Sequence, residues 1–511
     1  VITRKVVNSM NPSRYRRLAV LLACSLVASA YTCKAPTYHP SIAPLTDGMQ
    51  ISQAGAIPLT IATTPSTTLD HVTYFKQQGE GPFEMVAEFS DSQPYEWDVD
   101  ASQNGLVRWV AAVSSPTGGF GITPLVTVDV DVEAATGPSH PAMFINQQEI
   151  DAIKVKIAAD QEPWASAYDQ MISAANAALS KSAESVVDNG GGCVDANPHV
   201  FATDGVKNGT WGSRVDYQKA ERMSQAITAL GLGYAFSGEP AYANKALALL
   251  DHWMVDPATY MAPYNRNFSP HTCGWGHQWS IEVMITIPGM LYGADLIWNY
   301  PGWEPQTKAA VAQWASDIAA DARSQDGGYY NNGENWRYLL EASAGALLGD
   351  PSILDHAFAR YRNAFAGVLD STHTAGQMNA DGSLKYEIAR SVSLDYTNFA
   401  LLPMIGTAEI ARHNGVDPHN YKLSDGRGLE KGLDYSAPAT ANPALWTHPQ
   451  SPAYRGEQAG LHELAYLWKQ KPAYLGAVTK WGRPISGWVK TWVLGHPTLT
   501  HAYGAYPWQV H

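Results

Sequence analysis

The chain has 511 residues, of which 45% are hydrophobic and 16% charged, a composition typical of a globular protein with more than one domain. Its formal net charge of −13 excludes a nucleic-acid partner, because phosphate binding requires a basic surface. An acidic glycan is compatible with this charge only where cationic side chains gather locally. The 17 Trp and 26 Tyr supply flat rings of the kind that sugar-binding clefts use.

The first 30 residues have the pattern of an export signal. Three arginines within residues 14–17 precede an apolar run from Leu18 to Ala30, which ends in small residues. The run is too short to span a bilayer. Met10 is the expected start, with residues 1–9 as an upstream extension. Residues 21–24 also resemble a lipoprotein box, which would anchor the protein through Cys24. Either pattern predicts a periplasmic or secreted protein without a transmembrane segment.

Residues 31–48 are rich in Pro, Ser and Thr and predict a linker, and residues 49–135 have a β pattern. Valines at 126, 128, 130 and 132 alternate with polar residues, which is the period of a half-buried strand. Further short strands are expected at 72–75, 83–89 and 106–113, separated by turn residues. This spacing predicts a small antiparallel β-sandwich of immunoglobulin or fibronectin type, with a spacer or accessory glycan-binding role.

From residue 138 to residue 511 the hydrophobic period is that of helices. Helical segments are expected in successive pairs, at 147–160 and 163–180, 216–236 and 239–254, 276–297 and 304–324, 334–349 and 351–369, 395–414, and 456–469. Antiparallel pairs in a row predict a mainly α protein with an α/α toroid, in which one helix of each pair lines the inside.

The segments that lead into the first helix of each pair should gather on one face of this toroid. They hold most of the unusual polar and aromatic residues: Trp211, Arg214, Asp216 and Tyr217; His271, Cys273, Trp275 and His277; Asn331, Asn332, Glu334, Asn335 and Trp336; Glu387, Arg390 and Tyr396; Tyr454 and Arg455. Titratable and aromatic groups that converge at one mouth indicate an active site. Helix N-termini there also favour anions, so an acidic glycan could bind at this face although the net charge of the protein is negative.

Three stretches resemble the alginate lyase superfamily of polysaccharide lyases. They are His140 to Phe144 with the following Glu149-Ile150 and Glu162-Pro163-Trp164, the paired-Asn segment Asn331 to Trp336, and the Arg/Tyr segment from Asp381 to Tyr396. The Arg/Tyr segment is the most specific of the three. The resemblance covers residues 138–511 and implies an α/α toroid that cleaves polyuronates, such as mannuronan or glucuronan, by metal-independent β-elimination without a cofactor.

The sequence departs from this family at one position. The family commonly has a His directly after the paired Asn residues, and this chain has Gly333 there. His271 or His277 could supply the missing imidazole, with His277 favoured because it is expected at the start of an inner helix. Alternatively Tyr396 acts as the sole acid and base. The substrate therefore stays open among mannuronate, guluronate and glucuronate polymers.

The resemblance assigns roles that suit the chemistry. β-Elimination removes the C5 proton beside a carboxylate, so the enzyme must neutralise that carboxylate; Asn332 and Arg390 are suited to this. A tyrosine such as Tyr396 can take the proton and return one to O4 where nearby positive charge lowers its reference pKa of ~10. Glu387 is expected to orient Arg390.

Further residues are expected to contact the sugar chain. Trp275, Trp336 and Tyr329 are predicted platforms, and Glu334, Arg214, Tyr217 and Arg455 are predicted substrate contacts, with His462 as an additional one. Simpler explanations exist: Asn331 to Gly333 could be only a helix cap, and Glu387 with Arg390 only an i,i+3 pair. His271, Cys273 and His277 without a fourth ligand are a weak zinc pattern, so no metal is predicted.

Two other functions remain open from the sequence. An inverting glycoside hydrolase would use two carboxyl groups, recruited from Glu334, Glu387 and Asp216. A glycan-binding protein without activity is the second alternative, which the glycine at position 333 favours. Endo or exo action and oligomeric state are not readable, and Cys193 and Cys273 could be paired or free thiols.

Overall fold

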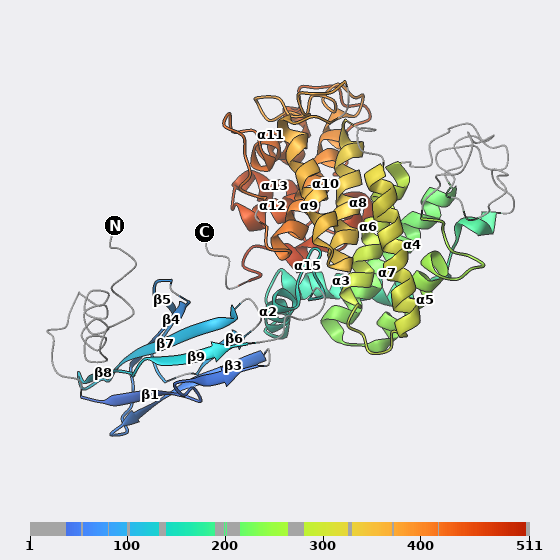
Figure 1. Cartoon of the computed structure of the whole chain (residues 1–511). Coiled ribbons are helices and arrows are strands. Elements are labelled where there is room, and N and C mark those ends of the chain that lie inside the picture. The colour runs from blue at the N-terminus through green and yellow to red at the C-terminus, as the bar shows by residue number, and fades with distance from the viewer. Residues whose placement is uncertain are drawn as a thin grey trace. The chain divides into compact units, whose positions relative to one another are not determined.

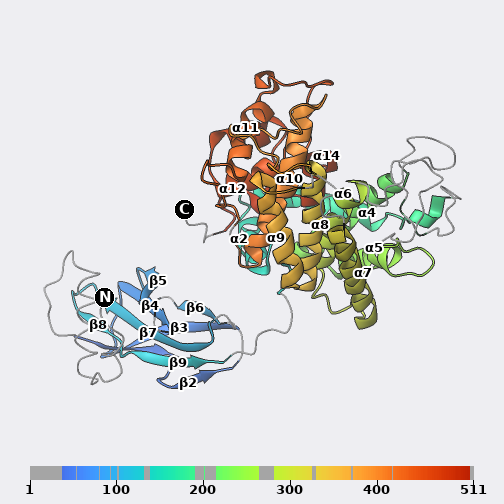
Figure 2. The same cartoon turned by 45° about the horizontal axis from the view of Figure 1, so that its top comes forward.

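The computed structural model describes residues 37–52, 55–79, 81–92, 94–99, 103–131, 139–189, 199, 201, 215–263, 281–324, 330–369, 372–416 and 418–506. The chain falls into two compact units, which divide between Thr136 and Gly137. Figures 1 and 2 show a unit of strands and a unit of helices. All four cysteines lie outside the described residues, as do the residues of the expected export signal.

The first unit is a β-sandwich, as predicted. Its strands are β1 (His39–Ala43), β2 (Met49–Ile51), β3 (Gly55–Thr64), β4 (His71–Gln78), β5 (Glu84–Phe89), β6 (Tyr95–Val99), β7 (Gly105–Ser114), β8 (Phe120–Ile122) and β9 (Val126–Val130). One sheet has the order β1-β3-β6 and the other β2-β9-β7-β4-β5, with β8 paired to β7. Leu59, Trp97 and Trp109 are fully buried in the core that both sheets share.

Two features of this unit differ from the expected pattern. Strand β1 lies within residues 31–48, where we expected an irregular linker, and pairs with β3 in antiparallel register. Strand β2 pairs with β9 in parallel, so the sandwich is not purely antiparallel. The alternation of valines is confirmed, because Val126, Val128 and Val130 are buried and the residues between them are half-buried.

The second unit is built from helices. They are α2 (Gln147–Ala158), α3 (Trp164–Leu179), α4 (Val215–Ser237), α5 (Pro240–Met254), α6 (Ile281–Leu296), α7 (Pro305–Ser324), α8 (Asn332–Leu348), α9 (Pro351–Ala366), α10 (Ser393–His413), α11 (Leu429–Ala441), α12 (Leu461–Trp468), α13 (Pro472–Lys480), α14 (Trp488–Thr491) and α15 (Pro497–His501), with 3₁₀ turns η3 (Val186–Asn189), η4 (Pro443–Leu445) and η5 (Trp492–Leu494). None of the described helices is long and apolar enough to cross a membrane.

The helices form the expected toroid of pairs. The inner helices pack in succession, α3 on α4, α4 on α6, α6 on α8 and α8 on α10, while α5, α7 and α9 pack outside them. Figures 1 and 2 show α8, α9 and α10 side by side. The sequence signals explain several boundaries: Asn146 and Glu149 form a capping box for α2, and Gly349 ends α8 in a left-handed conformation before Asp350 caps α9.

Glycines allow the closest approach between two inner helices. A Cβ on Gly293 of α6 would lie 2.5 Å from the carbonyl oxygen of Ile227 on α4, and a Cβ on Gly231 of α4 would lie 2.9 Å from the Cα of Gly293. Backbone atoms cannot yield at such distances, so only glycine fits. Thr228 Oγ1 also donates to the carbonyl oxygen of Gly289 across this contact, at 2.8 Å.

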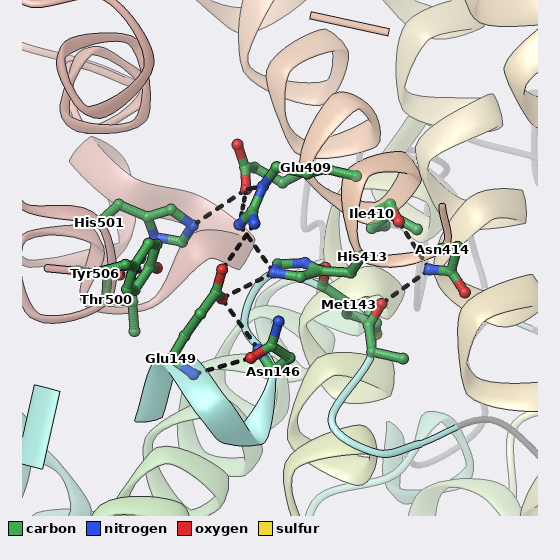
Figure 3. Close-up of polar contacts among 12 residues, drawn as sticks. Met143, Asn146, Glu149, Glu409, Ile410, His413, Asn414, Thr500, His501 and Tyr506 are labelled. Atoms are coloured by element: carbon green, nitrogen blue, oxygen red, sulfur yellow. Dashed lines mark hydrogen bonds and ion pairs between the residues drawn. The ribbon is translucent and has the colours of Figure 1, made fainter. Parts of the chain in front are cut away.

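A buried ionic network joins α2 to α10, with His501 of α15 beside it (Figure 3). Glu149 of α2 accepts from Arg412 Nη1 at 2.7 Å and lies 2.8 Å from His413 Nε2. Arg412 also donates to Glu409 on the same helix, and His501 of α15 lies 3.8 Å from Glu409. The charged groups of the network thus come from α2 and α10, while burial lowers the pKa of His501 to about 4 and keeps its imidazole neutral near pH 7. Burial raises the pKa of Glu149, but His413 and Arg412 outweigh it and lower this pKa to about 2.

Replacing Glu149 by Gln should destabilise the helical unit. The change leaves Arg412 and His413 without their carboxylate, and breaking a buried pair on one side costs about 3 kcal/mol. Urea unfolding followed by circular dichroism measures this. The matched control is Glu304→Gln at an exposed position, where we expect a change below about 0.5 kcal/mol. Equal effects of the two substitutions would contradict the conclusion that the ion pairs of Glu149 stabilise the helical unit.

The low pKa of Glu149 predicts that the folded protein loses stability in acid. Its folded pKa of about 2 lies below the ordinary value of 4.5, so its contribution is complete above pH 4.5 and is lost as the pH falls toward 2. We therefore expect the stability of the Glu149→Gln variant to decline less than that of the wild type over this interval. Unfolding curves recorded at several pH values test the difference.

Candidate active site

The paired asparagines at the start of α8 have different partners. Asn331 is the helix cap, and its Oδ1 accepts from the backbone N–H of Gly333 at 3.0 Å. Asn332 instead faces Glu387, whose Oε1 accepts from the Asn332 backbone N–H at 2.8 Å and from its Nδ2 at 3.0 Å. The cap explanation therefore accounts for Asn331 only. The second amide hydrogen of Asn332 has no partner among the residues that the structure describes.

Glu387 orients Asn332, which differs from the expectation that it would orient Arg390. The described hydrogen bonds of its side chain go to Asn332, while the side chain of Arg390 acts on this carboxyl group through charge and the Arg390 backbone N–H donates to the Glu387 carbonyl oxygen at 3.0 Å. Burial raises the pKa of Glu387 above its ordinary value, against the opposing effects of the two Asn332 bonds and of Arg390. The carboxyl group is thus an internal brace between α8 and the turn before α10.

Arg390 and Tyr396 are in direct contact. The guanidinium carbon of Arg390 lies 4.0 Å from the ring centroid of Tyr396, a cation–π geometry. Burial lowers the pKa of Arg390, but the hydrogen bond and charge of Tyr396, with Glu387 and Tyr330, outweigh it and raise this pKa. Both side chains are half-buried, so each is accessible to a ligand. Asn332, Glu387, Arg390 and Tyr396 thus form one continuous set of contacts.

A cavity of about 380 Å³ opens beside Tyr396. Its lining includes Asp395, Phe399, Arg455 and Glu457. Burial, a hydrogen bond to Glu457 and the charge of Glu457 raise the pKa of Asp395 to about 7, although Gln450 opposes this by donating to Asp395. The exposed Arg455 lines the same cavity, as predicted for a substrate contact. Asp395 is thus partly protonated near neutral pH, next to the tyrosine.

An aromatic cluster that includes Tyr330 lies near Arg390. Tyr330 stacks on His373 with 3.7 Å between ring centroids and 4° between planes, and Tyr386 packs edge-on against both. Tyr330 is 37% exposed and acts on the pKa of Arg390. Its neighbour Tyr329, the expected platform, lies outside the described residues. A partly exposed ring beside a guanidinium suits a sugar ring that carries a carboxylate.

Several predicted substrate contacts are wrong because the side chains are buried. Trp336 is fully buried and packs against Phe399 and Trp492, so it cannot be a sugar platform. Glu334 is fully buried and forms ion pairs with Arg337 and Arg360.

Tyr217 is half-buried against the core of the helical unit. His462 is fully buried, and burial lowers its pKa to about 3. It therefore cannot contact a substrate from its present position.

The carboxyl groups proposed for a glycoside hydrolase are also unsuited to that reaction. Asp216, Glu334 and Glu387 are all fully buried. The accessible pair Asp395 and Glu457 is hydrogen-bonded, whereas inverting hydrolases separate their two carboxyl groups by about 6.5–9.5 Å. The described residues therefore give no support to the hydrolase alternative.

The remaining predicted site residues, Arg214, His271, Trp275, His277 and Tyr329, lie outside the described residues. Within the described ranges, no three His, Cys, Asp or Glu side chains lie close enough to hold a metal ion. Sequence reasoning missed Asp395, Glu457, Tyr330 and His373. The position of Asp395 directly before Tyr396 was a usable signal, while Glu457 and His373 become neighbours of the site only through folding.

The fold and the site together define a helical toroid with a polar, aromatic-lined cavity at one mouth. The chain belongs to the alginate lyase family, whose sequence profile matches residues 154–446. A polysaccharide lyase of Stenotrophomonas maltophilia (strain K279a) is 24% identical over 208 residues, which cover 39% of this chain and 55% of that relative. The match thus spans about half the length of the curated relative.

Solved structures show the same fold. An alginate lyase from Bacteroides ovatus superposes with a TM-score of 0.58 at 20% identity, covering 71% of this chain and 99% of that one. Alginate lyase A1-III from Sphingomonas species A1 superposes with a TM-score of 0.52 at 22% identity, covering 72% of this chain and 97% of that one. A variant of A1-III complexed with a tetrasaccharide has a TM-score of 0.52 at 21% identity, covering 74% and 99%.

The carboxyl pair beside Tyr396 predicts an unusual titration. Asp395 should titrate near pH 7, and Glu457→Gln should move this titration toward the ordinary value of 3.8, because the repulsion and hydrogen bond of Glu457 are removed. Carboxyl-¹³C NMR of protein labelled at aspartate measures both values. A wild-type Asp395 that titrates near pH 4 would contradict the pairing, and Glu430→Gln, away from the cavity, should leave the titration unchanged.

Proposed function

We propose that the protein cleaves an acidic, uronate-containing polysaccharide by β-elimination, outside the cytoplasm. Family membership supports a lyase, and the observation that carries the proposal is the contact of Arg390 with Tyr396 beside an open cavity. The tetrasaccharide bound to alginate lyase A1-III supports an oligosaccharide as the ligand. The arginines and apolar run within residues 14–30 support export.

The reaction requires charge neutralisation before proton transfer. The C5–H bond breaks, its electron pair forms the C4–C5 double bond, and the C4–O4 bond breaks with its pair on oxygen. Because the C5 proton is adjacent to a carboxylate, its removal creates a dianion that must be stabilised. Arg390 has a planar fork of donors suited to a carboxylate, and the second amide hydrogen of Asn332 can add a further bond.

Tyr396 is the proposed base and acid. It takes the C5 proton as tyrosinate and returns a proton to O4 where both groups lie on the same face of the ring. The guanidinium carbon of Arg390 lies 4.0 Å from the centroid of its ring, so the phenol is adjacent to the proposed carboxylate-binding group. His271 and His277 stay predicted partners for the opposite stereochemistry, in which Tyr396 acts as the acid.

The decisive substitution is Tyr396→Phe. It removes the phenolic hydroxyl and keeps the ring on Arg390, so we expect turnover to fall by about 10³-fold or more with little change in substrate binding. Turnover is measured by the ultraviolet absorbance of the C4–C5 double bond on polymannuronate, polyguluronate and glucuronan. The control is Tyr503→Phe at an exposed site. Full activity in Tyr396→Phe would contradict the assigned role.

The hydrogen bonds between Glu387 and Asn332 predict that Glu387 acts by positioning Asn332. Glu387→Ala removes the acceptor of both Asn332 bonds, so kcat should fall by about 10²-fold while KM changes little. Glu387→Gln keeps a carbonyl oxygen for Asn332 and should recover most of this loss. Thermal unfolding shows whether each variant is folded. If Glu387→Ala and Glu387→Gln lower kcat equally, activity depends on the charge of Glu387 and not on its hydrogen bonds with Asn332.

A further inference from the structure

A second cavity lies inside the helical unit, away from Tyr396. It has a volume of about 590 Å³ and lies between α3, α4 and residues 486–496 near the C-terminus. The side of α3 that faces it is exposed and opposite to its buried side, where Met171 and Ala175 pack into the core. Gln170, Gln225 and Trp492 are among the side chains that line it.

Aromatic rings connect this cavity to the one beside Tyr396. Phe399 lines the first cavity and lies 5.3 Å from Trp492, which lines the second. Trp488 lies a further 5.3 Å from Trp492, measured between ring centroids. A backbone hydrogen bond also joins the segments that line the two cavities. The N–H of Gln458, which lines the first cavity, donates to the carbonyl oxygen of Val489 at 2.9 Å. Aromatic rings from the two linings are therefore in direct contact.

The charges of the two cavities differ. The first is lined by Arg455 and adjoins Arg390, which suits a carboxylate. In the second, Asp169 is the only Asp, Glu, Lys or Arg among the described lining residues. Burial lowers the pKa of His496 to about 4, so this imidazole is neutral near pH 7. A carboxylate here would meet repulsion from Asp169 and no described cation.

The polar groups of the second cavity suit hydroxyl groups. The amides of Gln170 and Gln225 each offer donors and an acceptor, and a neutral imidazole offers one of each. Trp492 is half-buried, so part of its ring is available to the apolar face of a pyranose. This combination of a flat ring and uncharged donors and acceptors is typical of sites for neutral sugars.

We propose that this second cavity is a subsite for a neutral sugar unit, a pyranose without a carboxylate, in the polysaccharide whose uronate occupies the first cavity. The proposal rests on the proposed function for the identity of that polysaccharide. It deepens this function by naming the substrate as a heteropolymer, in which uronate and neutral sugars both occur.

The test fills the cavity from an exposed helix position. Ala177 lines it on the exposed side of α3, and Ala177→Trp adds a large ring there without changing a buried side chain. The matched control is Ala309→Trp, an exposed alanine on α7. Binding of cellotetraose and mannotetraose, as neutral probes, and of a mannuronate tetramer is measured by calorimetry. Circular dichroism confirms that both variants are folded.

We expect the wild type to bind at least one neutral tetrasaccharide, and Ala177→Trp to weaken this binding at least about tenfold with Ala309→Trp unchanged. Ala177→Trp should weaken binding of the mannuronate tetramer less. Asp169→Asn should strengthen binding of the mannuronate tetramer and leave neutral binding nearly unchanged, because only the charge is removed.

Three outcomes would overturn the subsite: no neutral probe binds, Ala177→Trp leaves neutral binding unchanged, or it weakens the neutral and mannuronate tetramers equally. These binding results do not depend on turnover. If no polyuronate is cleaved but Ala177→Trp abolishes neutral binding, the proposed lyase function fails and the subsite stands. If polyuronates are cleaved and neutral binding is absent, the lyase function stands and the subsite fails.

Discussion

The arrangement of the site depends on one carboxyl group that a substrate does not reach. Glu387 accepts two hydrogen bonds from Asn332, and these join the first turn of α8 to the turn that carries Arg390. Arg390 in turn packs on Tyr396 at the start of α10. Both bonds go to one oxygen, Oε1, and because Glu387 is buried, leaving that oxygen unpaired would be costly, which keeps the asparagine in place. Direct contacts thus join the starts of α8 and α10 to the turn that carries Glu387 and Arg390.

An acidic protein can hold an acidic polymer when its charges are distributed unevenly. The net charge of −13 is spread over the chain, while Arg390 and Arg455 adjoin the cavity beside Tyr396. The carboxyl groups of Asp395 and Glu457 also adjoin it, but Asp395 is partly protonated near pH 7. The pair therefore carries less negative charge than two separate carboxylates would, which lowers the repulsion toward a uronate.

Helix periodicity predicted most of the toroid, and the family segments led to Asn332, Arg390 and Tyr396. The short helices α13, α14 and α15 were missed because their apolar pattern is brief, and α11 was missed although it has 13 residues, because Pro438 inside it is read as a helix breaker. Side-chain direction explains the errors on α8. Trp336 lies one turn beyond Asn332, where Phe399 and Trp492 cover it, and Glu334 points toward Arg360 of the outer helix α9. Contacts such as Asp395 with Glu457 depend on tertiary folding and have no local signature.

The ionic network around Glu149 has a consequence for how the helical unit folds. Its members come from α2, α10 and α15, so hundreds of residues separate the groups that must meet. Contacts between distant segments slow folding, since the intervening chain loses entropy before the contacts repay it. The network is therefore complete only once segments from both ends of the helical unit have come together.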